Sequence, residues 1–234
     1  MQPSVISVVI PAYNEEKTVG DVICKTISAM ESLRMPFEII VVDDGSTDNT
    51  GRIATRHKTT VLSNGKNRGK GYALRKGFQH AQGDIIVTLD ADGAHTPKEI
   101  SDLIDPLFKG VDIVAGSRFL GRGKNSTSRL NRFGNFIFNS VMMILTGKYI
   151  TDSQTGFRAF KKEVLKRVNL ESVGYEIETE ITVKGVNNGF VYQEKPISCG
   201  KRKYSVSKLK IFSDGIKILK TIFRANFTRD QGFK

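Results

Sequence analysis

The sequence has few of the residues that build disulfide frameworks and zinc clusters. Among its 234 residues, only Cys24 and Cys199 are cysteines, and there are only three histidines. Two cysteines cannot form a disulfide framework, and no spacing resembles a zinc cluster, which favours a reduced, cytoplasmic setting. No run of eighteen apolar residues occurs, so no helix is expected to span a bilayer. A predicted strand starts almost at once, and no signal peptide is expected.

Acidic residues are missing from a central stretch and scarce at the C-terminal end. None occurs between Asp112 and Asp152, where six Lys and Arg residues fall, and from Lys201 onward ten Lys and Arg face only Asp214 and Asp230. Together these two stretches carry more positive charge than the net +12 of the whole chain. Local basicity of this kind predicts anionic partners: phosphates, an anionic membrane surface or nucleic acid.

Three short apolar runs each end in acidic residues. They are VISVVIPAYNEE (5–16), EIIVVDDGSTDNT (38–50) and DIIVTLDADG (84–93). Short β-branched runs that alternate with helical patterns are typical of parallel strands in a βαβ sheet. In such sheets ligands bind beyond the carboxyl ends of the strands, so the acidic residues are expected to meet at one edge. Their mutual repulsion indicates a divalent cation that carries a phosphorylated ligand, because hard cations prefer oxygen ligands.

Apolar periodicity predicts the order of the other elements. Strands are expected at 4–10, 37–42, near 61, 84–89, 111–115 and 190–197. Helices are expected at 15–33, from 46 or 48 to 57, at 72–82, from 96, at 161–168 and at 175–187. Residues 153–160 are interpreted as a loop, and 129–145 and 208–227 as basic amphipathic stretches. The class predicted is α/β.

Several motifs together resemble a known family. PAYNEE (11–16), VVDDGSTDNT (41–50), LDADG (89–93), AGSRF (115–119) and QTGFRAF (154–160) occur in the order seen in family 2 glycosyltransferases. EKPISCGKRKYSVSKL (194–209) is similar to the tail segment of dolichyl-phosphate hexose synthases. The resemblance implies a GT-A fold, a Rossmann-like, mixed but mostly parallel sheet flanked by helices. It would fill residues 1–209, with a basic amphipathic C-terminal helix at 210–234.

The resemblance also implies roles for individual residues. The nucleotide-sugar site would comprise Pro11, Ala12, Tyr13, Glu15, Val41, Asp43, Asp90, Ala91, Asp92, Arg202 and Lys208. Within this set, Asp90 and Asp92 would hold Mg²⁺ or Mn²⁺. The acceptor phosphate would bind Arg118 with Arg129 or Arg132, whose planar guanidinium groups suit phosphate. The catalytic set would be Asp90, Asp92, Arg118 and Asp152.

Some positions allow two interpretations. Lys70 in the Gly-rich turn either binds phosphate or belongs to an ordinary turn, and Tyr13 either stacks on a base or packs in the core. His95 either assists the metal or is structural. Asp152 either orients the acceptor, acts as a base or caps a loop. Ala94 stands where mannosyl members of the family often have Gln, which favours a UDP-sugar over GDP-mannose, and Ser205 and Val206 depart from the tail pattern.

The function expected is inverting, metal-dependent transfer of a hexose from a nucleoside diphosphate sugar to dolichyl or polyprenyl phosphate. The product would supply lipid-linked sugar for protein glycosylation or cell-surface glycans. The amphipathic stretches predict peripheral attachment to the cytoplasmic face of a membrane. An alternative is a transferase of the same fold that acts on a soluble or glycan hydroxyl, with Asp152 as base. Nucleic acid is not an expected partner, because it would leave the acidic strand ends unexplained.

Overall fold

A seven-stranded sheet forms the centre of the computed structural model, which describes residues 4–120, 129–200 and 211–227. The strand order is β3-β2-β1-β4-β6-β5-β7, and β6 alone runs antiparallel to its neighbours. The strands are β1 (Ile6–Ala12), β2 (Phe37–Asp43), β3 (Thr60–Ser63), β4 (Ile85–Thr88), β5 (Ile113–Ser117), β6 (Arg158–Lys161) and β7 (Tyr192–Pro196). The mixed, mostly parallel α/β sheet that the sequence predicts is therefore confirmed.

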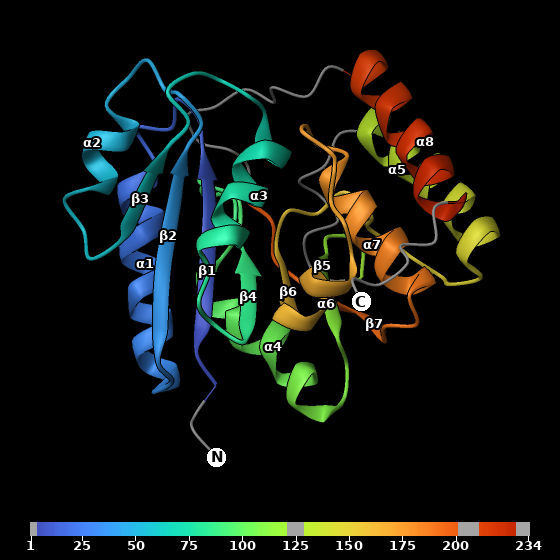
Figure 1. The fold of residues 1–234 in the computed structure, drawn as a ribbon, viewed down its shortest axis with the longest axis horizontal. Coiled ribbons are helices and arrows are strands. Elements are labelled where there is room, and N and C mark those ends of the chain that lie inside the picture. The colour runs from blue at the N-terminus through green and yellow to red at the C-terminus, as the bar shows by residue number, and fades with distance from the viewer. Residues whose placement is uncertain (1–3, 121–128, 201–210, 228–234) are drawn as a thin grey trace.

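Helices cover both faces of the sheet (Figure 1). They are α1 (Val19–Leu33), α2 (Thr50–Ala54), α3 (Lys70–His80), η1 (Pro97–Glu99), α4 (Ile100–Ile104), η2 (Asp105–Lys109), α5 (Arg129–Thr146), α6 (Lys162–Arg167), α7 (Ile177–Asn187) and α8 (Ile211–Phe227). Alternate residues of β1 separate two hydrophobic cores. Val8 and Ile10 pack with α1 and α4, whereas Val9 packs with α3, α6 and α7. This alternation follows from the period of two along a strand.

Two segments differ from the sequence-based expectations. Residues 158–160, interpreted as part of a loop, and Lys161, predicted to begin a helix, form β6 in the interior of the sheet. The fully buried Arg158 breaks the apolar pattern of this strand. The first helix begins at Val19 rather than at residue 15. Residues 16–18 form a turn ahead of the helix, in which the Glu15 carbonyl accepts hydrogen bonds from the Thr18 and Val19 N–H groups. The N–H groups of Asn14 and Glu15 donate to the hydroxyls of Ser46 and Thr50.

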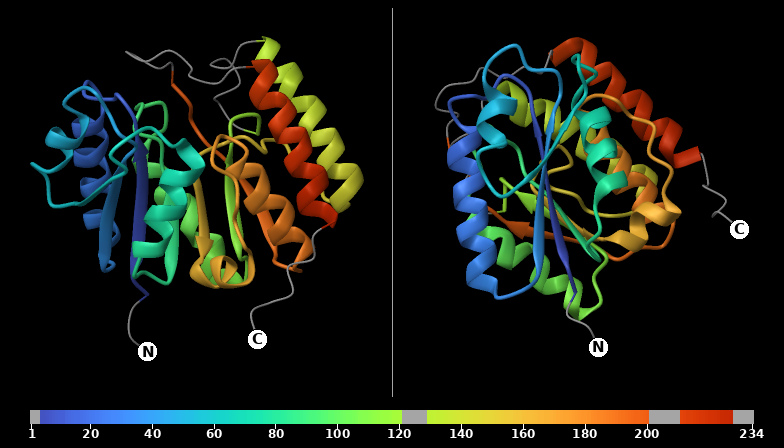
Figure 2. Two further views of the ribbon diagram at one scale, coloured as in Figure 1. Left: turned by 45° about the horizontal axis from the view of Figure 1, so that its top comes forward. Right: turned by 60° about the vertical axis from the view of Figure 1, so that its left-hand side comes forward.

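The amphipathic helices α5 and α8 lie side by side at one end of the molecule (Figure 2). Met142 of α5 and Ile218 and Ile222 of α8 form a third core with Val183 of α7. No helix in the described ranges is long and apolar enough to cross a membrane. The predicted boundary between a catalytic domain and a C-terminal helix, at 209/210, falls outside the described residues.

Candidate active site

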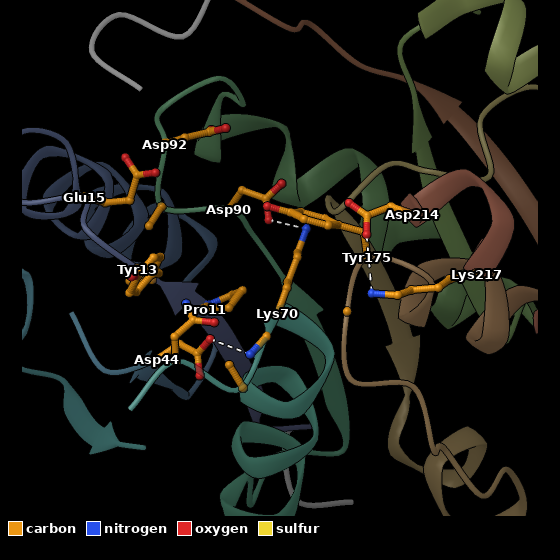
Figure 3. A pocket seen from close by; sticks show the side chains of 16 residues that line it. Pro11, Tyr13, Glu15, Asp44, Lys70, Asp90, Asp92, Tyr175, Asp214 and Lys217 are labelled. Atoms are coloured by element: carbon orange, nitrogen blue, oxygen red, sulfur yellow. Dashed lines mark hydrogen bonds and ion pairs between the residues drawn. The ribbon is translucent and has the colours of Figure 1, made fainter. Parts of the chain in front are cut away.

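A pocket of about 770 Å³ lies beyond the carboxyl ends of β1 and β4 (Figure 3). Its lining comes from the β1 end and the loop after it, the end of β2, the start of α3, the turn after β4, residues 174–175 and α8. The lining residues are Pro11, Ala12, Tyr13, Glu15, Asp44, Asn67, Gly69, Lys70, Ala73, Asp90, Ala91, Asp92, Gly174, Tyr175, Asp214 and Lys217. The strand ends thus meet at one edge, as the sequence predicts, and they enclose a space large enough for a nucleotide-sized ligand.

Asp90 and Asp92 occupy the turn that follows β4. Asp92 is 8% exposed, and its Oδ1 accepts a hydrogen bond from the Ala94 N–H at 2.9 Å, which fixes the turn. The Oδ1 of Asp90 lies 2.6 Å from the Lys70 ammonium. Both carboxylates border the pocket; Asp92 lies on the side of Glu15, and Asp90 points toward Lys70 (Figure 3).

Lys70 joins the acidic turn to α7. Besides Asp90, its ammonium contacts Glu178 Oε1 at 2.7 Å, and Glu178 is only 3% exposed. Burial alone would lower the pKa of Lys70, but the two carboxylates raise it above its ordinary value, so the ammonium stays charged. Burial raises the pKa of Glu178, and the charge of Lys70 opposes that shift. From the sequence, Lys70 could either bind phosphate or belong to an ordinary turn. In the structure it is the counterion of Asp90.

The Gly-rich turn before α3 needs its glycines for close packing. Gly69 has φ +100°, and a Cβ there would lie 2.3 Å from the Val173 carbonyl oxygen. Asp44 holds this turn, because its carboxylate accepts hydrogen bonds from the backbone N–H groups of Arg68 and Gly69 at 3.0 and 2.8 Å. The pocket lining therefore includes Asp44, the second of the two adjacent aspartates at the end of β2, together with the turn that it fixes.

Two predicted nucleotide ligands, Val41 and Asp43, are not among the residues that line the pocket. Val41 is fully buried in the core on the α1 side of the sheet. Asp43 accepts a hydrogen bond from the Ser46 N–H at 2.9 Å, and its Oδ2 would lie only 2.6 Å from a Cβ on Gly51. Neither residue belongs to the pocket lining, whereas Asp44 does.

The loop after β1 is tied to the loop after β2. Asp48 accepts a hydrogen bond from the Glu16 N–H at 3.1 Å and others from the N–H and hydroxyl of Thr50. Burial would raise the pKa of Asp48, but these hydrogen bonds outweigh it and lower that pKa. The PAYNEE and DDGSTDNT motifs therefore form one unit, which holds Tyr13 and Glu15 at the pocket.

Arg118 and Asp152 form a bidentate ion pair. Arg118 Nε lies 2.7 Å from Asp152 Oδ2 and its Nη2 lies 2.8 Å from Oδ1, and Asp152 is fully buried. Burial would lower the pKa of Arg118, but Asp152 raises it. A buried, arginine-paired carboxylate suits an orienting role better than that of a base. Arg118 is not among the lining residues of the pocket. The side chains of Arg129, Arg132, Arg202 and Lys208 lie outside the described part of the chain.

His95 is buried directly after the acidic turn. Its ring lies 5.4 Å from the ring of Phe157, and its Nδ1 has no hydrogen-bond partner among the described residues. Burial lowers the pKa of His95 in spite of the nearby charges of Asp90 and Asp92. The imidazole is therefore neutral at pH 7. It is not part of the pocket lining.

The acidic turn suits a hard divalent cation that shares its ligands with a phosphate. Within the described ranges, no three His, Cys, Asp or Glu residues gather as a complete metal site. Asp90 and Asp92 supply carboxylate oxygens beside an open pocket. Mg²⁺ and Mn²⁺ are commonly held by one or two carboxylates, with substrate phosphates and water as the other ligands. The residues present fit such an ion.

Tyr175, Asp214 and Lys217 line the pocket, although no motif of the sequence marks them as part of this site. Asp214 and Lys217 belong to α8 and lie across the pocket from Tyr13 and Glu15 (Figure 3). Their contribution depends on how α8 packs against α5 and α7. Asp44, by contrast, stands next to a predicted residue, and only the local chain direction distinguishes the two.

The fold is that of a GT-A glycosyltransferase. The sequence model of the family "Glycosyl transferase family 2" matches residues 7–168, and the chain belongs to this family. An uncharacterized protein of Methanocaldococcus jannaschii is 38% identical over 92% of this chain and 89% of its own length. These findings confirm the resemblance read from the motifs.

Two further relatives have names that state an activity. A dolichol-phosphate mannosyltransferase of Pyrococcus furiosus is 34% identical over 88% of this chain, which spans only 59% of that protein. A polyprenol monophosphomannose synthase of Mycolicibacterium smegmatis is 32% identical over 86% of this chain and 80% of its own length. Among solved structures, glucosyl-3-phosphoglycerate synthase of Mycobacterium tuberculosis, in complex with Mn²⁺, UDP and phosphoglyceric acid, superposes with a TM-score of 0.76. It covers 97% of this chain, which covers 80% of it, and at 24% identity it shows the shared fold.

Proposed function

We propose that this glycosyltransferase moves a hexose from a nucleoside diphosphate sugar to a polyprenyl phosphate, with inversion and with Mg²⁺ or Mn²⁺. One observation carries the proposal. The pocket is bordered on one side by the acidic strand ends and on the other by α8, an amphipathic helix with exposed apolar residues (Figure 3). A nucleotide and a lipid phosphate would reach the same pocket from these two sides.

The nucleotide would bind on the β1 side. Tyr13 has an aromatic face for the base, and Glu15 offers a carboxylate to ribose or base hydroxyl and N–H groups. Asp90 and Asp92 would hold the metal ion, which when bound would neutralise charge on the leaving diphosphate. Ala94 in place of a longer polar side chain favours a UDP-sugar as donor. The names of the mannosyl relatives point instead to a mannosyl donor, so the two must be tested side by side.

The acceptor phosphate needs little activation. The second pKa of a phosphomonoester is about 6, so the group is largely dianionic at pH 7. One of its oxygens would attack the anomeric carbon while the bond from that carbon to the diphosphate breaks, and the nucleoside diphosphate leaves. The protein's task is alignment. Arg118 and Lys217 are the cations that we assign to the acceptor phosphate; Lys217 lines the pocket and lies 3.6 Å from Asp214.

A hydroxyl acceptor fits the site less well. A hydroxyl must lose its proton during attack, so such an enzyme needs a general base within reach. Asp152, the base expected under that alternative, is fully buried and paired with Arg118. A phosphate acceptor makes no such demand, and the arginine of the same pair gives it a counterion.

The outer faces of α5 and α8 would rest on a membrane. Several large apolar side chains are exposed there, with Ile144 at 77% and Phe136 at 68%. The others on these helices are Ile137, Met143, Ile216 and Phe223, and Tyr149, just after α5, is exposed as well. Exposed Lys220 and Arg224 lie on the same helix as Phe223. Apolar side chains flanked by basic ones are typical of helices that lie in the membrane interface, and the cytoplasmic leaflet supplies anionic lipid.

The test is a donor screen with a lipid acceptor. Radiolabelled UDP-glucose, UDP-N-acetylglucosamine and GDP-mannose are each incubated with polyprenyl phosphate in micelles, with Mg²⁺, Mn²⁺ or excess EDTA. We expect one donor to label the lipid only with metal present, and Asp92→Asn to abolish labelling without loss of fold. Full labelling in EDTA or in the mutant would remove the metal from the mechanism. Label appearing only on soluble glycans would overturn the acceptor assignment.

A further inference from the structure

Arg118 owes its position to a short segment that has no regular structure. Residues 151–153 connect the region after α5 with β6, and Asp152 is their middle residue. The Asp152 carboxylate accepts two hydrogen bonds from the Arg118 guanidinium, and its Oδ2 also accepts one from the Arg118 backbone N–H at 3.1 Å. The orientation of the guanidinium group therefore depends on where residues 151–153 are held.

Glu194 of β7 holds the segment from one side. Its Oε2 lies 2.9 Å from the Thr151 N–H and 2.7 Å from the Thr151 hydroxyl, and its Oε1 lies 3.0 Å from the Asp152 N–H. The hydroxyl of Tyr192 donates to the same carboxylate at 3.1 Å. Burial raises the pKa of Tyr192, so this hydroxyl stays protonated and able to donate. These donors are all neutral, so the hydrogen bonds described here for this carboxylate hold backbone and hydroxyl groups in place.

Asn139 of α5 holds the segment from the other side. Its amide Nδ2 donates to the Thr151 carbonyl at 2.7 Å, and its Oδ1 accepts from the Ser153 N–H at 3.2 Å. The Thr151 hydroxyl also lies 2.6 Å from the hydroxyl of Ser117, the residue before Arg118. The segment is thus fastened to β5, to β7 and to a helix whose outer face is apolar.

We propose that Glu194 and Asn139 are positioning residues that hold Arg118 ready for the acceptor phosphate, through residues 151–153. This rests on the proposed function for the identity of the acceptor. We call Glu194, Asn139 and the segment that they hold, residues 151–153, the clamp. The clamp also links α5, one of the two helices with an exposed apolar face, to the arginine that would bind the lipid phosphate. The position of α5 and the alignment of the acceptor phosphate would then depend on the same set of hydrogen bonds.

Physical reasons favour such a clamp. A buried ion pair is favourable only in good geometry with its remaining hydrogen-bonding groups satisfied. If residues 151–153 were held less firmly, Asp152 and Arg118 could separate, and the guanidinium group of Arg118 would no longer have a fixed orientation. In Glu194→Gln, one oxygen becomes an NH₂ group that faces N–H or hydroxyl donors, so at least one hydrogen bond is lost. Asn139→Ala removes both of its contacts with the segment.

The first experiment measures Arg118 directly, without turnover. Phenylglyoxal, an arginine-selective reagent, is reacted with the full chain, and the Arg118 peptide is quantified by mass spectrometry. We expect Arg118 to be modified several-fold faster in Glu194→Gln and in Asn139→Ala than in the unmodified chain. Matched controls are Gln193→Ala, an exposed neighbour on β7, and Ser140→Ala, whose hydroxyl bonds to the Phe136 carbonyl within α5. Equal rates in all five proteins would overturn the clamp.

The second experiment separates acceptor from donor. Both clamp variants should raise the KM for polyprenyl phosphate about tenfold, in line with loss of a hydrogen bond to a charged group, and leave nucleotide affinity nearly unchanged. In an Arg118→Ala background, Glu194→Gln should add no further loss, because both changes act on the same contact. Additive losses would contradict a role through Arg118. If Glu194→Gln fails to fold, Asn139→Ala carries both measurements.

The two proposals fail in different ways. If the chain transfers no sugar to polyprenyl phosphate but the clamp variants still expose Arg118 to phenylglyoxal, the function is wrong and the positioning role holds. If transfer occurs and Arg118→Ala raises the acceptor KM, while the clamp variants behave like Gln193→Ala and Ser140→Ala, the function holds and the clamp is wrong.

Discussion

The ammonium of Lys70 lies 2.6 Å from Oδ1 of Asp90, at the start of the turn that is expected to hold the metal ion. Lys70 opens α3, and Asp90 follows β4, so one ion pair joins the Gly-rich turn to the acidic turn. Glu178 of α7 completes the group at 2.7 Å from the same ammonium. Asp90 is thereby oriented before any ligand arrives.

Lys70→Met should cost both activity and stability. It leaves Glu178 buried without its counterion, and removing one partner of a buried pair typically costs about 3–5 kcal/mol of unfolding free energy. The double mutant Lys70→Met/Glu178→Gln should recover much of that stability and none of the transfer activity, because Asp90 still lacks its partner. Urea unfolding and initial rates measure the two effects. Recovery of activity in the double mutant would show that Lys70 matters only for folding.

Asp48 should stabilise the nucleotide-side loops in a pH-dependent way. The folded state lowers the pKa of Asp48 below its ordinary value of 3.8. Its contribution is therefore present above pH 3.8 and is lost as the pH falls through the lowered folded value. We expect Asp48→Ala to reduce the free energy of unfolding by about 1 kcal/mol at pH 7, with a shrinking difference below pH 4. Urea titrations across this range test the trend, and a difference that grows toward acid would contradict it.

Lys217 and Lys220 offer a matched comparison on α8. Both are exposed lysines one helical turn apart, but Lys217 lines the pocket and Lys220 does not. Lys217→Ala should raise the KM for polyprenyl phosphate several-fold, since a phosphate loses a nearby cation. Lys220→Ala should leave this constant unchanged at fixed micelle composition. Steady-state kinetics with the lipid acceptor decide the matter, and equal effects of the two changes would speak against a phosphate contact at Lys217.

Membrane attachment should depend on the apolar faces of α5 and α8. The protein should float with anionic vesicles at low salt and less with neutral vesicles or at high salt, because each basic residue near an anionic surface adds about 1 kcal/mol. Phe136→Asp/Ile144→Asp should abolish flotation. Phe108→Asp, a change at an exposed aromatic residue of η2, is the control. A chain that stays wholly in the soluble fraction with anionic vesicles at low salt would defeat the docking model.

The sequence predicted the parts of the site whose signal is local. Each acidic strand end follows a continuous apolar run, and parallel strands bring such ends to one edge whatever the details of packing. That reasoning places Asp90 and Asp92 at the pocket. The same local reasoning could not choose between Asp43 and Asp44, because neighbouring side chains diverge where β2 ends. In the structure Asp44, and not Asp43, is among the residues that line the pocket.

The remaining parts of the site depend on contacts between distant segments. Glu178 is more than a hundred residues from Lys70, and its helical pattern shows only that it is a polar residue on α7. The sequence did not predict β6, because Arg158, a charged residue at the first position of the strand, breaks the apolar pattern. In the structure the buried guanidinium donates three hydrogen bonds, to the carbonyls of Ser153 and Thr155 and to the Thr182 hydroxyl. The place of α8 at the pocket follows from its packing on α5 and α7, which periodicity does not specify.

The most direct test of the central claim follows the acceptor phosphate itself. Polyprenyl phosphate, the donor selected by the screen and Mg²⁺ or Mn²⁺ are incubated with the full chain, and phosphorus NMR records the reaction. The account predicts that the phosphomonoester signal of the lipid converts to a phosphodiester signal, with one nucleoside diphosphate released for each lipid converted. Release of nucleoside diphosphate with the lipid phosphomonoester unchanged would contradict it.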